Sequence, residues 1–142
     1  MKYFLLLLFT GWLPLFAQQH RDQVSPDTIQ VGIYVNSIYD LNISDGSFKS
    51  VFWLWFQYHQ DSLNPLQTVE IENSKSVEVK FKETEITQTG KWATQKCFAN
   101  LKEDWNIQHF PFDRQVLDIT IEESSKDASM VVFVPDALNS RL

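Results

Sequence analysis

The sequence contains a single cysteine, Cys97, so it cannot form an internal disulfide, and it has no spacing typical of a zinc or iron–sulfur centre. Because Cys97 alternates with apolar neighbours, we expect a buried small hydrophobic side chain rather than a reactive thiol. Basic residues are also scarce, with 12 Lys and Arg against 18 Asp and Glu. Nucleic-acid binding requires a basic patch, so this composition argues against a nucleic-acid partner.

Catalytic patterns are missing from the sequence as well. It has no glycine-rich phosphate loop and no nucleophile, kinase or metalloprotease motif. Its three histidines, His20, His59 and His109, are far apart in the chain. Glu70 and Glu72 could form an acid and base pair, but their spacing is typical of a solvated strand face. We therefore predict a protein that is not an enzyme and needs no metal or cofactor, with an exported hydrolase as the least favoured hypothesis.

The only long apolar run is at the start of the chain, MKYFLLLLFTGWLPLFA, where one basic residue, Lys2, comes first. This pattern predicts a cleaved secretory signal peptide over residues 1–17. A membrane anchor is the alternative, but the run is short for a span of about 20 residues and contains Pro14. Cleavage removes Lys2 and changes the net charge from −6 to −7. We expect an exported chain with a flexible leader over residues 18–27 and one domain over residues 28–142.

Most of the remaining chain alternates between apolar and polar residues, which is typical of strands with one face in a core. Turn signals such as Asp45-Gly46 separate the alternating segments. Residues 49–61 are apolar at nearly every position, which predicts a strand covered on both faces. Residues 91–105 fit a strand better than a helix, because the helical stripe would be only weakly apolar. About seven strand segments result, at residues 28–41, 49–61, 68–73, 76–89, 91–105, 116–124 and 129–136. Their number and spacing predict an all-β fold, an antiparallel immunoglobulin-like β-sandwich.

The sequence HFPFDRQ, residues 109–115, places apolar side chains on a turn, where loops usually carry polar residues. Pro111 fixes its own φ and holds the residue before it in an extended conformation. Asp113 can accept backbone N–H groups within such a turn. Phe110 and Phe112 either fold back as plugs on the core or form an apolar knob that docks on another surface. The residues alone leave both interpretations open.

Phe-Pro-Phe-Asp-x-Gln followed by a strand resembles the signature loop of the pentameric ligand-gated ion channels, the Cys-loop receptor superfamily and its bacterial relatives. SFKSVFWLWFQY, with Trp53, Leu54 and Tyr58, resembles the second strand of that family, and IQVGIYVNSIYDLN resembles the first. In the animal receptors two cysteines close the loop, whereas Glu103 and Leu117 stand at those positions here. The resemblance is therefore to the bacterial type, which lacks the disulfide.

This resemblance implies a sandwich of about ten strands, of which the pattern supplies about seven, so we expect the domain to be incomplete at its C-terminus. It implies a small-molecule site between subunits that includes Trp53, although the residues by themselves favour a core position for Trp53. The implied partners are an unknown small-molecule ligand, the chain's own pore domain and further copies in a homopentamer. The implied gating-coupling loop lies at the membrane end and comprises Phe110, Pro111, Phe112, Asp113 and Gln115, with Asp45 beside it.

The sequence thus predicts the extracellular or periplasmic ligand-binding domain of a neurotransmitter-gated type of ion channel, which is associated with the membrane through its pore domain. The alternative is a stand-alone exported β-sandwich protein without channel activity. Such a protein would bind a small molecule on exposed aromatic side chains such as Trp53, Trp55 or Trp92.

Overall fold

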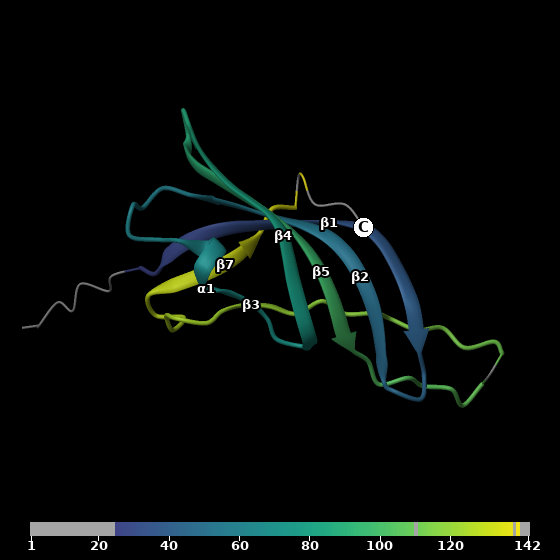
Figure 1. Cartoon of the computed structure of the whole chain (residues 1–142). Coiled ribbons are helices and arrows are strands. Elements are labelled where there is room, and N and C mark those ends of the chain that lie inside the picture. The colour runs from purple at the N-terminus through teal and green to yellow at the C-terminus, as the bar shows by residue number, and fades with distance from the viewer. Residues whose placement is uncertain (1–24, 110, 138, 140–142) are drawn as a thin grey trace, which may run out of the picture.

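The computed structural model describes residues 25–109, 111–137 and 139, so the predicted signal peptide and most of the predicted leader lie outside the described residues. The described chain forms seven strands and one short helix (Figure 1). In chain order these are β1 (Asp27–Asn42), β2 (Ser47–Tyr58), α1 (Pro65–Thr68), β3 (Val69–Ile71), β4 (Ser74–Thr87), β5 (Gly90–Lys102), β6 (Ile121–Glu123) and β7 (Val131–Pro135). Strand β1 starts at Asp27, which the sequence analysis placed in the leader.

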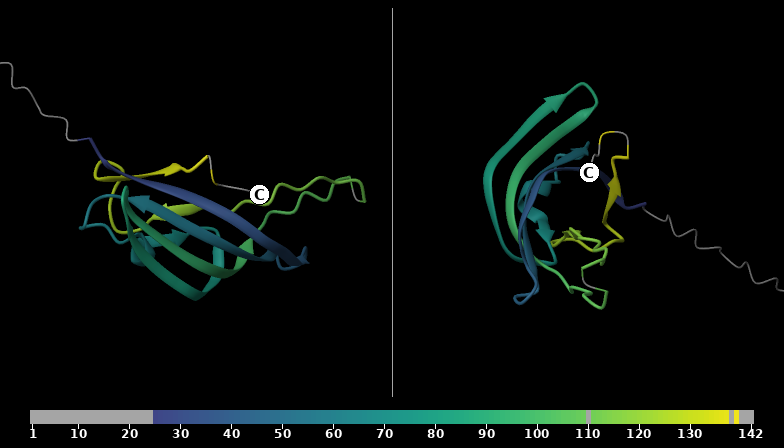
Figure 2. Two further views of the ribbon diagram at one scale, coloured as in Figure 1. Left: turned by 90° about the horizontal axis from the view of Figure 1, so that it is seen from above. Right: turned by 90° about the vertical axis from the view of Figure 1, so that its right-hand side faces the viewer.

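Five strands form a curved sheet in the order β4-β5-β2-β1-β7, and β3 pairs with β6 in a second, two-stranded sheet. All neighbouring strands pair antiparallel except β1 and β7, which run parallel from Asp27 opposite Val131 to Val31 opposite Pro135. The small sheet and helix α1 lie on the concave side of the large sheet (Figure 2). The predicted all-β, sandwich-like fold is confirmed. The prediction that all strands pair antiparallel is wrong for β1 and β7, which pair in parallel.

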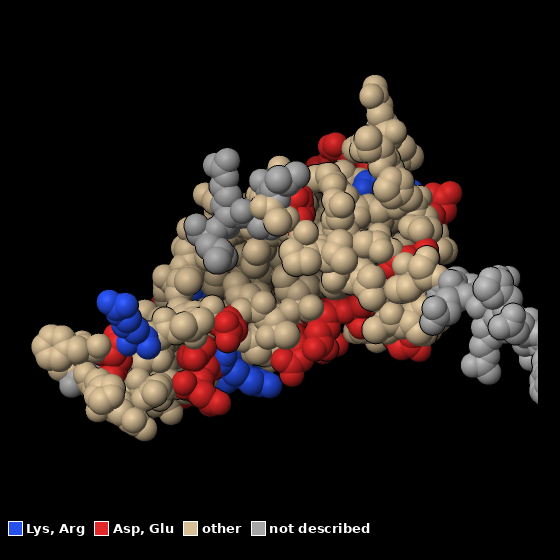
Figure 3. Space-filling model, turned by 180° about the vertical axis from the view of Figure 1, so that it is seen from behind, with Lys and Arg blue, Asp and Glu red and all other residues tan. Residues whose placement is uncertain are grey.

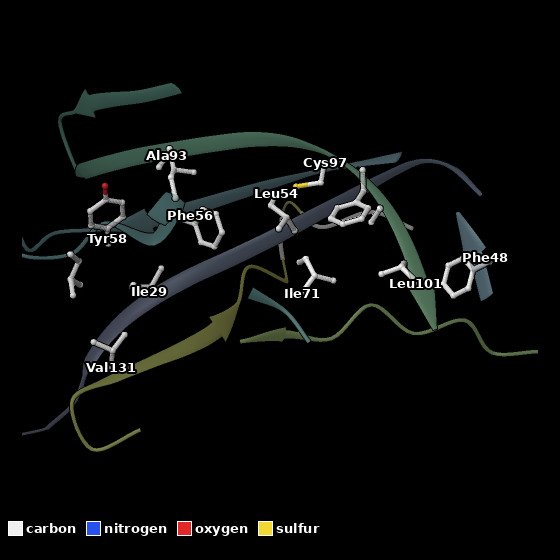
Figure 4. Close-up of a cluster of buried hydrophobic side chains, with 14 residues drawn as sticks. Ile29, Phe48, Leu54, Phe56, Tyr58, Ile71, Ala93, Cys97, Leu101 and Val131 are labelled. Carbon is white, nitrogen blue, oxygen red and sulfur yellow. The ribbon is translucent and has the colours of Figure 1, made fainter. Parts of the chain in front are cut away.

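The inner face of β2 supplies the centre of the core. Phe52, Leu54 and Phe56 have no exposed surface, and burying each contributes about 1.5–3 kcal/mol. The facing positions of β5 are smaller, since Ala93 and Cys97 lie there, also without exposed surface. This confirms the strand interpretation of the β5 segment. The core also contains Ile29, Phe48, Tyr58, Leu63, Leu66, Ile71, Ala99, Leu101 and Val131 (Figure 4).

The outer face of β2 is covered around Trp55, as expected for a strand that is apolar on both faces. The Trp55 indole is 9% exposed, stacks on Trp92 at 6.1 Å between ring centroids, and donates from Nε1 to Asp136 Oδ2 at 2.9 Å. Gly32 on β1 is opposite Trp55, and a Cβ atom at Gly32 would overlap the indole ring. A glycine is therefore required where the Trp55 ring lies across the neighbouring strand.

The sequence predicts a strand over residues 116–124, but only its last part forms one, as β6. In the described structure, residues 116–120 are bonded to the side chain of Asn73, and the Thr120 carbonyl also accepts from the Glu72 N–H at 3.0 Å. Asn73 Nδ2 donates to the Asp118 carbonyl at 2.8 Å, and Asn73 Oδ1 accepts from the Thr120 N–H at 3.1 Å. Alternate side chains of this segment still pack against the core. The alternation in the sequence thus reflects one-sided burial without a strand partner.

Candidate functional site

Residues 103–120 connect β5 to β6 as a long projection, called the arm below. The arm extends beyond the end of the large sheet at which β1 turns into β2 (Figures 1 and 2). It carries HFPFDRQ at its far end, where Phe110 lies outside the described residues. The structure therefore places Pro111, Phe112, Asp113 and Gln115 at the projecting end of the arm, and Asp45 on the turn between β1 and β2.

The base of the arm is bonded to the turn between β1 and β2. The Glu103 N–H donates to the Gly46 carbonyl at 3.0 Å, and Trp105 Nε1 donates to the Asn42 carbonyl at 3.1 Å. Gly46 has a φ of 56°, which glycine adopts without the strain of a side chain, as the Asp45-Gly46 pattern predicts. Residues from both segments line an open cavity of about 780 Å³. The structure thus brings this turn and the start of the arm together.

Asp45 on that turn is held by two side chains. Its Oδ2 accepts from Lys75 Nζ at 2.8 Å and from Ser47 Oγ at 2.9 Å, and Lys75 Nζ also donates to the Asp45 carbonyl at 2.6 Å. The hydrogen bond from Lys75, followed by that from Ser47, lowers the pKa of Asp45. Exposed ion pairs contribute little to global stability, so the effect of Lys75 is to orient the turn.

Acidic side chains collect near the base of the arm. Burial raises the pKa of Glu103, and the nearby charges of Asp118 and Asp104 raise it further. On the face that Figure 3 shows, acidic side chains lie along the lower edge of the body, and the projecting end carries blue and red side chains beside uncharged ones. The end of the arm therefore combines apolar side chains with the charges of Asp113 and Arg114.

The two runs of the arm are joined midway by one side chain. Gln115 Nε2 donates to the Asn106 carbonyl at 2.6 Å, and Gln115 Oε1 accepts from the Asn106 N–H at 3.3 Å. A side-chain amide can make both bonds at once because it carries a donor and an acceptor side by side. Gln115 thus acts as an internal brace of the arm.

The tip is a turn closed by the backbone and by Asp113. The Phe112 N–H donates to the His109 carbonyl at 2.8 Å, and the His109 N–H donates to Asp113 Oδ1 at 2.7 Å. Asp113 thus accepts a backbone N–H within the turn, as predicted from its position after Pro111. The hydrogen bonds of Asp113 and Gln115 hold the arm in shape, and Phe112 and Val116 remain exposed.

Exposed apolar side chains gather at this end of the molecule. Phe112 is 88% exposed and Val116 is 78% exposed, and Ile43 and Ile107 are about half exposed. A side chain as exposed as Phe112 does not plug the core, so its geometry fits the apolar knob. Exposed apolar patches are typical of contact sites for another protein or a membrane, and Phe112 and Val116 are the most exposed large apolar side chains of the arm.

Trp53 lies on the outer face of the large sheet and is not part of the buried core. Its ring packs edge-on against Phe81 at 5.5 Å between centroids, and Lys96 Nζ lies 5.4 Å from its centre. A side-chain ammonium therefore holds the position that a cationic ligand would take. Trp53 is six residues along β2 from Ser47, or about 20 Å of strand, so the structure does not bring it together with the arm.

Sequence reasoning missed the bonds between Asn106 and Gln115 and the exposure of Val116. The sequence contains a signal for the bonds between Asn106 and Gln115. These two residues stand at similar distances on either side of Pro111, as paired positions of a hairpin do. The ring contact of Lys96 had no local signal, since it depends on the register between β2 and β5.

The fold and the arm together define an all-β chain of two sheets with a braced, apolar-tipped projection. No protein-family model matches the chain, and no curated protein matches it significantly. Within the described residues, no group of three His, Cys, Asp or Glu side chains is arranged to hold a metal ion. No helix in the described part of the chain has the length and apolar character needed to span a membrane.

Proposed function

We propose that this chain is the exported ligand-binding domain of a pentameric ligand-gated ion channel, and that the arm couples ligand binding to the pore. The observation that supports this most is that an exposed phenyl group, Phe112, stands at the end of a projection braced by Gln115. Bonds from Glu103 and Trp105 tie that projection to the β1–β2 turn. A braced arm with a fixed base moves with the sheet, which is what transmission of a displacement requires.

In this proposal Trp53 contributes to a small-molecule site between neighbouring copies of a homopentamer. Lys96 must then leave the Trp53 ring, or the ligand must bind beside it, since Nζ lies over that ring. An anionic or zwitterionic ligand could use both residues, the ammonium of Lys96 for its negative group and the ring for its remaining surface. The proposal assigns this site to ligand binding and not to catalysis.

The gene and the native complex test this proposal directly. We expect the reading frame to continue beyond codon 142 into further strands and about four apolar spans. We also expect the complex extracted from native membranes to have the mass of five copies. A stop codon directly after codon 142, or a monomer as the only native form, would remove the channel proposal.

The coupling role of Phe112 has a matched control on the same chain. Ile86 on β4 is also 88% exposed, but it belongs to the β4–β5 hairpin rather than to the arm. In channel recordings we expect Phe112→Ser to shift the ligand concentration for half-maximal current by about tenfold, while ligand affinity of the closed state stays the same. Ile86→Ser should change neither quantity. If the two variants have the same ligand concentration for half-maximal current, Phe112 has no part in coupling.

A stand-alone exported binding protein is the second candidate, and the outer sheet face favours it. Tyr34 and Phe81 are 47% and 41% exposed there, on either side of the Trp53–Lys96 pair across four strands. Such a protein should change its tryptophan fluorescence with a small amine, carboxylate or sugar and release heat on binding. Silence in both measurements across these three classes would end this candidate.

A further inference from the structure

An open groove of about 680 Å³ lies between strand β1 and residues 115–121 of the returning chain. Its apolar lining comes from both of these walls and comprises Ile33, Val35, Ile38, Leu117, Ile119 and Ile121. Ile38 is 45% exposed, so this apolar surface reaches the solvent. An apolar groove that opens to solvent beside a sheet is a typical surface for binding another molecule.

The edge of β1 beside this groove is paired along only part of its length. Strand β7 pairs with β1 from Asp27 to Val31, whereas β2 pairs with the other side of β1 as far as Asn42. Within the described part of the chain, residues 34–39 therefore have no strand partner on the side of β7. Backbone N–H and C=O groups on such an edge can pair with a further strand. A strand placed there would continue the row that β7 begins.

The opposite edge of the large sheet, strand β4, is protected against such pairing. Charged side chains are spread along β4, namely Lys75, Glu78, Lys80, Lys82, Glu83 and Glu85. Residues 34–39 of β1, with the sequence YVNSIY, carry no charge. Both edges contain a bulge, so charge is what distinguishes them. Charged side chains keep edge strands from pairing with other chains, so the uncharged part of β1 is the edge that is open to a partner.

We propose that residues 34–39 of β1 bind an extended segment of another polypeptide, which adds a strand to the large sheet. Successive side chains of a strand point to opposite faces, so alternate residues of the segment enter the groove and are apolar. The residues between them are basic, because the chain has a net charge of −6 and Asp118 is exposed at the groove. A second copy carries the same negative charge, which disfavours it as the partner. The site lies within one chain and is independent of the proposed channel function.

Three synthetic peptides test this proposal by isothermal titration calorimetry on the chain as it exists. The first alternates lysine and valine over seven residues, the second has the same composition in two blocks, and the third is the first with N-methylated backbone amides. We expect the alternating peptide to bind at least about tenfold more tightly than either of the others, the factor typical of losing a few hydrogen bonds. With this peptide bound, hydrogen exchange should slow at those amides of residues 34–39 that do not bond to β2, and should not change along β4.

One variant with a matched control locates the binding site. Ile38→Lys places a charge on the groove wall, and the exposure of Ile38 allows the chain to fold with this change. It should weaken binding of the alternating peptide by at least about tenfold. Ile86→Lys adds the same charge at an exposed position of β4 and should leave binding intact. A peptide with glutamate in place of lysine should bind more weakly, and the difference should shrink at high salt.

Several results would overturn the proposal. Equal affinities of the unmodified chain for the three peptides would reject strand addition, and this comparison holds even where a variant fails to fold. Slower exchange along β4 instead of β1 would place the peptide on the other edge. Protection of residues 34–39 that rises with chain concentration in the absence of peptide would assign the edge to a second copy. Loss of peptide binding in the product of the complete gene would assign it to a strand of the same chain, whereas a stop codon after codon 142 would remove only the channel proposal.

Discussion

Gln115 bonds the backbone of Asn106 twice, donating to its carbonyl at 2.6 Å and accepting from its N–H at 3.3 Å. This pair lies between two other sets of hydrogen bonds in the arm. One set closes the tip around His109, and the other ties the base of the arm to the β1–β2 turn. Among the described residues of the arm, this amide joins the outgoing and returning runs midway. The shape of the exposed surface around Phe112 therefore depends on Gln115 as well as on Asp113, which closes the tip.

Gln115→Ala should loosen the arm without unfolding the domain. Each lost bond contributes about 0.5–1.5 kcal/mol at most, and exposure reduces that further, so we expect the unfolding free energy to fall by less than about 1 kcal/mol. Hydrogen exchange at the Asn106 amide should become several-fold faster. Gln108→Ala, which leaves the Gln115 amide in place, should change neither quantity, and unchanged exchange in Gln115→Ala would show that the brace has no effect on the arm.

Gly32→Ala should be one of the most damaging single substitutions in the chain. Its Cβ atom would overlap the Trp55 indole, which Asp136 and Trp92 hold in place. Overpacking of this kind costs about 1–3 kcal/mol or more, and chemical denaturation should show the loss. Asn36→Ala, an exposed change on the same strand, should stay within about 0.5 kcal/mol. In a Trp55→Leu background the penalty of Gly32→Ala should shrink, and a penalty that does not shrink would refute the proposed clash.

The Cys97 thiol should resist alkylation in the folded chain. Its ionisation should lower the free energy of unfolding only at alkaline pH. Burial raises its pKa from the usual 9.0 to about 11, with Lys82 acting in the opposite direction. The unfolded chain loses this proton first, so the contribution to stability is complete below about pH 9 and declines as the pH rises to about 11. Iodoacetamide labelling at pH 8 should follow the unfolding rate. Rapid labelling under native conditions would contradict the buried position, and Cys97→Ala should lack this alkaline decline.

The sequence was sufficient wherever one face of a strand is buried against the core. The pattern in residues 91–105 was sufficient to predict a strand, and the inner face of β5 carries Gln95 and Cys97. Local turn chemistry likewise predicted that Asp113 accepts a backbone N–H. The shortness of β6 could not be predicted, since Asn73, far away in the sequence, replaces a strand partner there. The ammonium of Lys96 over Trp53 is also a consequence of strand register, which alternation does not specify.

The carboxyl group of Asp45 should titrate below its ordinary value of 3.8, because Lys75 and Ser47 stabilise the charged form by donating hydrogen bonds. As the pH falls, the unfolded chain takes up this proton before the folded chain does. The contribution of Asp45 to stability is therefore present above about pH 3.8 and is lost as the pH falls through the lower folded value.

Carbon-13 NMR of the Asp45 carboxyl group measures this titration directly. Lys75→Met should move its pKa up toward 3.8, and Ser47→Ala should move it by a smaller amount, in the order of the two causes. Lys80→Met removes an equal charge from β4 that is paired with Glu78 instead, and should leave the curve in place. The Gly46 carbonyl, next to Asp45 on the turn, accepts from the Glu103 N–H. Loss of the Asp45–Lys75 bond, in acid or in Lys75→Met, should therefore also speed hydrogen exchange at the Glu103 amide. Superimposed titration curves for Lys75→Met and the unmodified chain would show that Lys75 does not hold the turn on which the arm rests.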